Sequence, residues 1–299
     1  MDDINQNASI LMKRGIALLD ANTPASLQEA ITCFDSAIEL RQQLPLHTNP
    51  LIRYGLAAGW INRGDALARL GSNENQVEAL RSYDAALEIL NGLEVDSDPL
   101  FRRRLAIAWQ NRGLLLQEQN DVSLLGEAES SFKAAIAALQ EGNAAQIPDR
   151  DYLLAAARLN YAKGLSLGKT LESMLQAKSM AREAMALADR FSAQNEGMAD
   201  VSLKARHILC RALTQLLVDL DGATVSTSEL IGDATDAAEE GLVLVRAWEA
   251  RGVERFRPVA QDLFQFAARV YRIFQPQFFN EFLLEHFNPW PESPESRAK

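Results

Sequence analysis

The chain has 299 residues, of which 47% are apolar and 23% are charged, with a formal net charge of −10. This composition is too apolar for a disordered chain, and 16 Gly with 10 Pro are too few for a low-complexity one. No uncharged apolar stretch of about 18 residues occurs, which predicts no membrane-spanning helix, and the acidity disfavours nucleic acid or a membrane surface as a partner.

The cysteines, the histidines and the N-terminal sequence indicate the cellular compartment and whether a cofactor is expected. Cys33 and Cys210 cannot form a disulfide framework, and their apolar neighbours predict small buried side chains. His47, His207 and His286 are far apart and lack metal-ligand spacing, so no metal or other cofactor is expected. The N-terminus has no basic region followed by an apolar run, unlike a secretory signal. These features predict a cytoplasmic protein.

A repeat with a period of 49 residues organises the chain from its beginning. It aligns residues 60–67, Trp-Ile-Asn-Arg-Gly-Asp-Ala-Leu, with residues 109–116, Trp-Gln-Asn-Arg-Gly-Leu-Leu-Leu. Five copies are expected at about 5–45, 49–94, 98–142, 148–194 and 198–250. The glycine of the motif, replaced by alanine in the last copy, is found at Gly15, Gly64, Gly113, Gly164 and Ala212.

Each copy is predicted to form two helices. Asn49 before Pro50 is an N-cap followed by Pro at the first helical position, and Gly71 is a stop signal. The second helix carries an aromatic residue between two alanines, as in Ala79, Tyr83 and Ala86. We expect the small residue of the first helix to admit this ring, so that the two helices pack closely.

The motif Trp60-x-x-Arg63-Gly64-x-x-Leu67, followed by Ala79-x-x-x-Tyr83, resembles the tetratricopeptide repeat. The resemblance covers about residues 5–250 and is clearest in the first three copies. It implies an all-α fold, a right-handed α-α superhelix of about five helix pairs, followed by C-terminal capping helices. This chain departs from the family in its long period and in having a basic residue where the family has Leu before the Gly.

That basic residue recurs in every copy, at Arg14, Arg63, Arg112, Lys163 and Arg211. It could form an electropositive ladder that binds an acidic partner. It could instead form internal ion pairs, because an acid recurs before the first alanine of the second helix, at Glu29, Glu78, Glu127 and Asp233. The sequence favours ion pairs, since acid and base recur together, although Gln176 interrupts the acidic series in the fourth copy.

The resemblance also indicates a binding surface. In tetratricopeptide superhelices an Asn two positions after the Trp often faces the concave side and binds a peptide backbone, which implies this role for Asn62 and Asn111, with Lys13 in the first copy. The alternative is an Asn satisfied by water or by the next repeat. The flanking residues expected on the same surface are Ile61, Asp65, Gln110, Leu114, Tyr161 and Leu165.

The composition changes after residue 250, because eight of the 12 Phe lie between residues 256 and 287. Two helices are predicted in the aromatic-rich segment 251–287, at about 255–275 and 277–287 on either side of Pro276. They would cap the last repeat, or form a homodimer contact through Phe278, Phe279 and Phe282. Residues 288–299 are expected to be disordered.

No phosphate-binding glycine loop, zinc-protease motif or nucleophile elbow occurs in the sequence. We therefore expect no enzymatic activity. The favoured hypothesis is a scaffold that binds a peptide or protein segment on its concave face. The alternatives are a structural protein that self-associates through its C-terminal aromatic helices, and a sensor module that binds a small ligand between helices.

Overall fold

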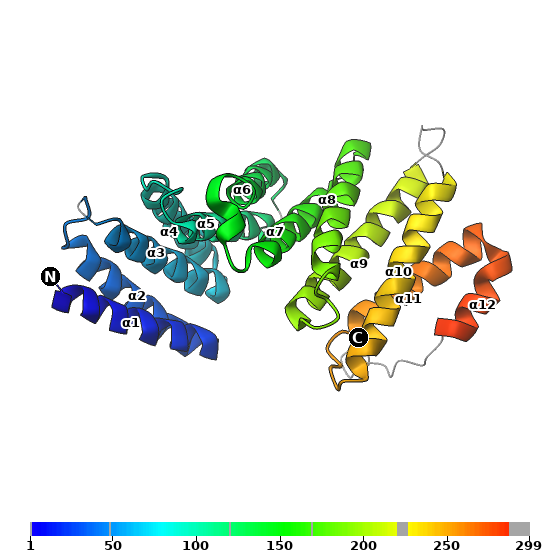
Figure 1. Ribbon diagram of the computed structural model, residues 1–299, viewed down its shortest axis with the longest axis horizontal. Helices are drawn as coiled ribbons and strands as arrows, with labels where there is room; N and C mark the ends of the chain where they lie inside the picture. The colour runs from blue at the N-terminus through cyan, green and yellow to red at the C-terminus, as the bar shows by residue number, and fades with distance from the viewer. Residues whose placement is uncertain (1, 48, 120, 169, 220–226, 287–299) are drawn as a thin grey trace. The chain divides into compact units, whose positions relative to one another are not determined.

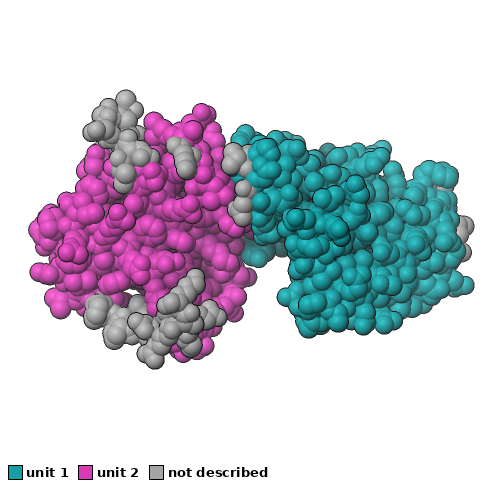
Figure 2. Space-filling model, turned by 180° about the vertical axis from the view of Figure 1, so that it is seen from behind, with its two compact units in different colours: residues 1–153 teal, residues 154–299 magenta. Residues whose placement is uncertain are grey.

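The computed structural model describes residues 2–47, 49–119, 121–168, 170–219 and 227–286, and within these ranges the regular structure is entirely helical. The predicted all-α fold is therefore confirmed. The chain divides into two compact units, residues 1–153 and 154–299 (Figure 2). The helix α7, Arg150–Leu165, contains the division between them.

Unit 1 is a series of helices in which each packs against the next, and α3 also contacts α1 and α5 (Figure 1). Two 3₁₀ turns, Val122–Leu124 and Gly142–Gln146, flank its last helix. The α-helices of this unit are α1 Asp2–Ala21, α2 Pro24–Gln42, α3 Pro50–Leu70, α4 Asn73–Asn91, α5 Pro99–Glu118 and α6 Leu125–Ala138.

Unit 2 continues the pairing of consecutive helices, and its helix α11 contacts both α10 and α9. The two predicted C-terminal helices are present, but Pro276 is the first residue of α12 instead of separating the helices, and the break is at Gln275. Helix α11 contacts α9 and α10 as a cap does. The helices of this unit after α7 are α8 Leu171–Asp189, α9 Glu196–Asp219, α10 Thr227–Glu249, α11 Arg257–Phe274 and α12 Pro276–His286.

The helix limits follow from local capping. The Asn49 side chain accepts a hydrogen bond from the Leu51 amide at 2.9 Å, and Pro50 occupies the first turn of α3. Gly71 ends α3 with φ of 74°, a left-handed conformation that Gly adopts without steric cost. Both limits are those predicted from the sequence.

The recurring glycine is required by an aromatic ring of the second helix. A Cβ atom added at Gly64 would lie 2.6 Å from Cε1 of Tyr83, which is closer than real Cβ contacts. Gly15 and Gly113 have the same relation to Phe34 and Phe132. The predicted close approach is therefore confirmed in the first three copies.

Unit 2 makes its close helix contacts differently. Ala181 replaces the aromatic residue and is fully buried. The close approach moves to α10, where a Cβ atom at Gly241 would lie 2.6 Å from Cδ1 of Leu263 in α11. In this unit a glycine of the last repeat therefore receives the capping helix.

The predicted dimer residues have different environments. Phe278 is 48% exposed and Phe279 is half-buried. Phe282 is buried, with its ring stacked on Phe264 at a centroid distance of 5.3 Å. The prediction that Phe282 forms a surface contact is therefore wrong, because its ring fills the space between α11 and α12. The predicted disordered tail, 288–299, lies outside the described residues.

Two further features bear on the predicted environment of the chain. Within the described ranges, no helix is both long and apolar enough to cross a membrane. Cys33 and Cys210 are free and buried, as predicted, and burial raises the pKa of the Cys210 thiol to about 12. A thiol with this pKa stays protonated at neutral pH, so it behaves as a small apolar side chain.

Candidate functional site

The basic column forms internal ion pairs in unit 1. Arg63 donates from Nε to Asp35 Oδ1 at 2.7 Å and from Nη1 to Ser82 Oγ at 2.7 Å. Its Nη1 also lies 3.8 Å from an oxygen of Glu78. The guanidinium therefore joins α3 to the helix before it, α2, and to the helix after it, α4.

Arg112 repeats this arrangement one copy later. It donates to Asp84 at 2.8 Å, to Ser131 at 3.0 Å and to Glu127 at 3.1 Å. At the first copy, Arg14 lies 3.9 Å from Glu29, and both side chains are largely exposed. The ion-pair interpretation is thus confirmed for the first three copies.

The same interpretation is wrong at Asp233 in unit 2. Asp233 lies 3.1 Å from Nζ of Lys178 and also pairs with Arg182, both on α8, whereas the predicted partner Arg211 is an exposed side chain. The physical reason is that α8 already brings two cations to this carboxylate. Lys163 is exposed as well, and the residue at its partner position, Gln176, carries no charge.

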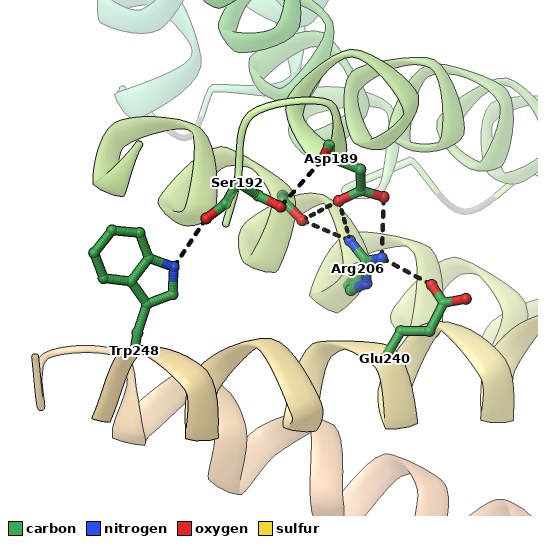
Figure 3. A network of polar contacts seen from close by, with 6 residues as sticks. Asp189, Ser192, Arg206, Glu240 and Trp248 are labelled. Atoms are coloured by element: carbon green, nitrogen blue, oxygen red, sulfur yellow. Dashed lines mark hydrogen bonds and ion pairs between the residues drawn. The ribbon is translucent and has the colours of Figure 1, made fainter. Parts of the chain in front are cut away.

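Unit 2 instead holds one buried arginine that the repeat did not predict. Arg206 of α9 donates to both carboxylate oxygens of Asp189, at 2.8 and 3.0 Å, and to Glu240 at 2.8 Å (Figure 3). Beside this network the Trp248 indole donates to the Ser192 carbonyl at 2.9 Å. These contacts tie α8, α9 and α10 together, which is a structural role.

A groove of about 300 Å³ in unit 1 brings several of the predicted binding residues together. Asp65 of α3 lies in it, and its Oδ1 accepts a hydrogen bond from the Tyr83 hydroxyl at 2.7 Å and from the Asn111 amide at 2.8 Å. Leu114, one turn after Asn111 on α5, lines the same groove. Three predicted site residues therefore share one place between α3, α4 and α5.

Burial and hydrogen bonding act on the Asp65 carboxyl in opposite directions. Burial raises its pKa, while the hydrogen bonds from Tyr83 and Asn111 and the charge of Arg69 lower it, and the net shift is upward. Burial and the Asp65 charge raise the pKa of Tyr83, so its hydroxyl stays protonated and donates. The groove thus presents a partly desolvated carboxylate in a fixed orientation.

The other predicted residues do not join this groove. Ile61, Tyr161 and Leu165 are buried, so the prediction that they line an open surface is wrong. They lie on the buried faces of their helices, where apolar side chains pack against neighbouring helices. Lys13 is exposed, and Asn62 and Gln110 are half-buried.

Asn62 and Asn111 occupy equivalent places but have different surroundings. Asn111 reaches back to Asp65 in the preceding copy. One copy earlier, the residue corresponding to Asp65 is Ile16, which cannot accept a hydrogen bond. Asn62 therefore has no equivalent acceptor, and the two asparagines do not form one continuous ladder.

Sequence analysis did not select Tyr83 as a site residue, because it occupies the aromatic position of the repeat. The available signal was its hydroxyl, since the equivalent residues are Phe34 and Phe132. Arg69 and Glu118, at the rim of the groove, were also missed. Elsewhere, the described residues contain no cluster of three or more His, Cys, Asp or Glu side chains arranged to hold a metal ion.

Comparison with known proteins assigns no family. No protein-family model matches the chain, and no curated protein matches it. Among solved structures, it resembles BtubC (BKLC) from P. vanneervenii, with a TM-score of 0.46 and 16% identity over 89% of this chain and 95% of that chain. It also resembles Nro1, described as a hypoxic regulator of sterol synthesis and a nuclear import adaptor, with a TM-score of 0.40 and 12% identity over 96% and 98%.

Proposed function

We propose that this protein is a non-catalytic interaction scaffold, and that unit 1 binds an extended segment of a partner protein in the groove beside Asp65. The observation that carries the proposal is the meeting of Asp65, Asn111 and Leu114 in one groove. All three belong to positions at which the tetratricopeptide resemblance implies peptide contact.

The groove offers the two kinds of contact that an extended peptide needs. The lone pairs that Asp65 does not use for Tyr83 and Asn111 can accept backbone N–H groups. The half-buried Leu114 supplies apolar surface for a side chain of the peptide. Because Tyr83 and Asn111 already orient the carboxylate, binding does not have to order it.

The test is affinity capture from a lysate of the source organism, with wild type beside Asn111→Ala and Asn62→Ala. Captured proteins are identified by mass spectrometry, and overlapping peptides of each are titrated against the same variants. Asn62→Ala is the matched control, because it removes the same side chain one copy earlier, where Ile16 occupies the place of the Asp65 carboxylate. We expect a peptide that binds wild type and Asn62→Ala but binds Asn111→Ala about tenfold more weakly, the effect of one lost charge-assisted contact.

The scaffold proposal fails if no partner is captured reproducibly. The proposed location fails if a bound peptide has the same affinity for Asn111→Ala and for Leu114→Glu as for wild type. A peptide that binds Asn62→Ala weakly as well would extend the site along the first three copies.

A second candidate function, self-association, is supported by the apolar side chains exposed near the end of α11 and on α12. Leu284 is 89% exposed, and Ile273, Phe274 and Phe278 are exposed to a lesser degree. Large apolar side chains exposed close together in the sequence are candidates for a protein contact. Light scattering on wild type and on Phe278→Ser/Leu284→Ser tests this: a wild-type mass of two chains that falls to one in the variant supports it, and a wild-type mass of one chain refutes it.

A further inference from the structure

A second groove, of about 650 Å³, lies between α4, α5 and α6 of unit 1. It is separate from the groove at Asp65, because Trp109 lines this one and Asn111 lines the other, and the two positions are about 160° apart around α5. Glu88, Glu127 and Gly126 also line it. The half-buried indole of Trp109 forms its aromatic wall.

Comparison of the second and third copies of the repeat shows why this groove is open. Trp60, Arg63 and Glu78 of the second copy recur as Trp109, Arg112 and Glu127, so the surroundings are kept. Three larger residues at the edge become small in the third copy: Glu74, Val77 and Arg81 are replaced by Ser123, Gly126 and Ser130.

Gly126 is not required by the packing of its own helix. A Cβ atom added there would meet nothing within 4 Å, in contrast to the glycines that receive an aromatic ring. A helical Gly with free space around it costs about 1 kcal/mol relative to Ala. The missing side chain therefore has no internal use, and its effect is to leave space in front of Trp109.

The third copy also lacks a cation that the second copy has. In the second copy Arg81 donates to Glu78 at 2.5 Å, and Glu78 lies near Arg63 as well. In the third copy Ser130 occupies the place of Arg81, and its hydroxyl donates to the Gly126 carbonyl of its own helix at 2.9 Å. Glu127 keeps its contact with Arg112 at 3.1 Å, but no charged side chain stands at the position equivalent to Arg81.

The acids of this groove exceed its bases. Asp84, Glu88 and Glu127 line it together with a single arginine, Arg112, which is already shared between Asp84 and Glu127. An incoming cation would therefore be attracted and would face carboxylates that are at least half exposed.

We propose that this groove binds an arginine side chain of a partner protein, whose guanidinium takes the place that Arg81 fills in the preceding copy. It contacts Glu127 and lies against the Trp109 ring, because both side chains line this groove. Arginine suits this site better than lysine, because its planar group binds a carboxylate in a bidentate manner and stacks on an aromatic face.

The experiment is an NMR titration of the full chain with N-acetyl-L-arginine methylamide, with indole signals assigned by Trp→Phe variants. We expect shifts of the Trp109 indole N–H and of the Gly126 amide. The citrulline analogue, which has the same shape without the charge, should produce no shift, and the lysine analogue should bind more weakly. Absence of shifts with the arginine compound, or equal shifts with citrulline, overturns the proposal.

Reciprocal variants test the location. Gly126→Val/Ser130→Arg gives the third copy the side chains of the second at two of the three edge positions, and should weaken binding of the arginine compound at least about tenfold. Val77→Gly/Arg81→Ser opens the equivalent place beside Trp60 and should create a second set of shifts at that indole. A filled variant that binds as wild type does overturns the proposal.

Two further variants keep the result interpretable. Glu127→Gln preserves the shape of the side chain and removes its charge, so it should weaken binding of the arginine compound. It tests the site independently if Gly126→Val/Ser130→Arg fails to fold. Asn111→Ala alters the groove of the proposed function and should leave binding of the arginine compound unchanged. The arginine site and the peptide groove can thus fail independently.

Discussion

The two units hold their ion-paired arginines in different ways. In unit 1, Arg63 and Arg112 contact Asp, Ser and Glu residues at the same distances along the sequence, because the partners repeat with the arginine. In unit 2, Arg206 contacts Asp189, Ser202 and Glu240, which the repeat does not predict. Where the repeat is kept, the same contacts therefore recur in successive pairs of helices. Where the repeat is lost, the helices are joined by residues whose spacing in the sequence does not recur.

The units also differ in how deeply these arginines lie. The side chain of Arg206 is 5% exposed, whereas that of Arg63 is 18% exposed. A charge farther from water interacts more strongly with its partners and leaves a larger penalty when the partner is lost. This difference gives the largest predicted effect on stability.

Arg206→Met should lower the free energy of unfolding by about 3 kcal/mol, because it leaves Asp189 without its bidentate partner inside unit 2. Arg63→Met should cost about 1–2 kcal/mol, since its partners Asp35 and Glu78 can turn to water. Urea unfolding followed by circular dichroism measures both. Equal losses of unfolding free energy in the two variants would contradict the predicted difference between the units.

Gly64→Ala should destabilise unit 1 by about 1–2 kcal/mol. The added methyl group would lie 2.6 Å from the Tyr83 ring, and the strain exceeds the gain in helix propensity. Gly232→Ala in α10 is the matched control, because a Cβ atom there meets nothing within 4 Å. It should stabilise the protein by up to about 1 kcal/mol. Two changes of the same sign would contradict the packing argument.

Arg14→Met should change the free energy of unfolding by less than about 0.5 kcal/mol. Its contact with Glu29 is 3.9 Å long, and both side chains are more than half exposed. The same denaturation measurement applies, with Arg63→Met as the comparison. A cost similar to that of Arg63→Met would show that the ion pairs of Arg14 and Arg63 stabilise unit 1 equally, which contradicts the prediction.

A pH effect on stability near neutral pH should arise from His286 in unit 2. Burial, followed by the charge of Arg246, lowers the pKa of the His286 imidazole below its ordinary value of 6.5, against the opposing charges of Glu239 and Glu285. The folded protein therefore takes up this proton less readily than the unfolded chain. The stabilisation by neutral His286 is present above the unfolded pKa and is lost as pH falls through the folded pKa.

The measurement for His286 is the difference in unfolding free energy between wild type and His286→Gln, followed between about pH 8 and 5. Wild type should lose stability relative to the variant as the solution becomes acidic. His207, whose pKa burial also lowers, is retained in both proteins and cancels in the difference. A difference that does not vary with pH would refute the prediction.

The sequence by itself determined the features that depend on local or periodic chemistry. The N-cap Asn49 and the stop at Gly71 define α3, because capping needs only neighbouring residues. The contact of Gly64 with Tyr83, and its repetition in two other copies, follows from the constant spacing of small and aromatic residues. The ion pairs of the first three copies were predicted for the same reason.

Only the tertiary structure decided which helix faces meet. Periodicity places Ile61 and Asp65 on one helix but does not tell which is covered, and Ile61 is buried while Asp65 lines a groove. Asp233 and Arg206 found partners on helices that the repeat did not indicate. Side chains from three helices converge only when all three have packed, so the chemistry of each groove is a property of the fold and not of any one motif.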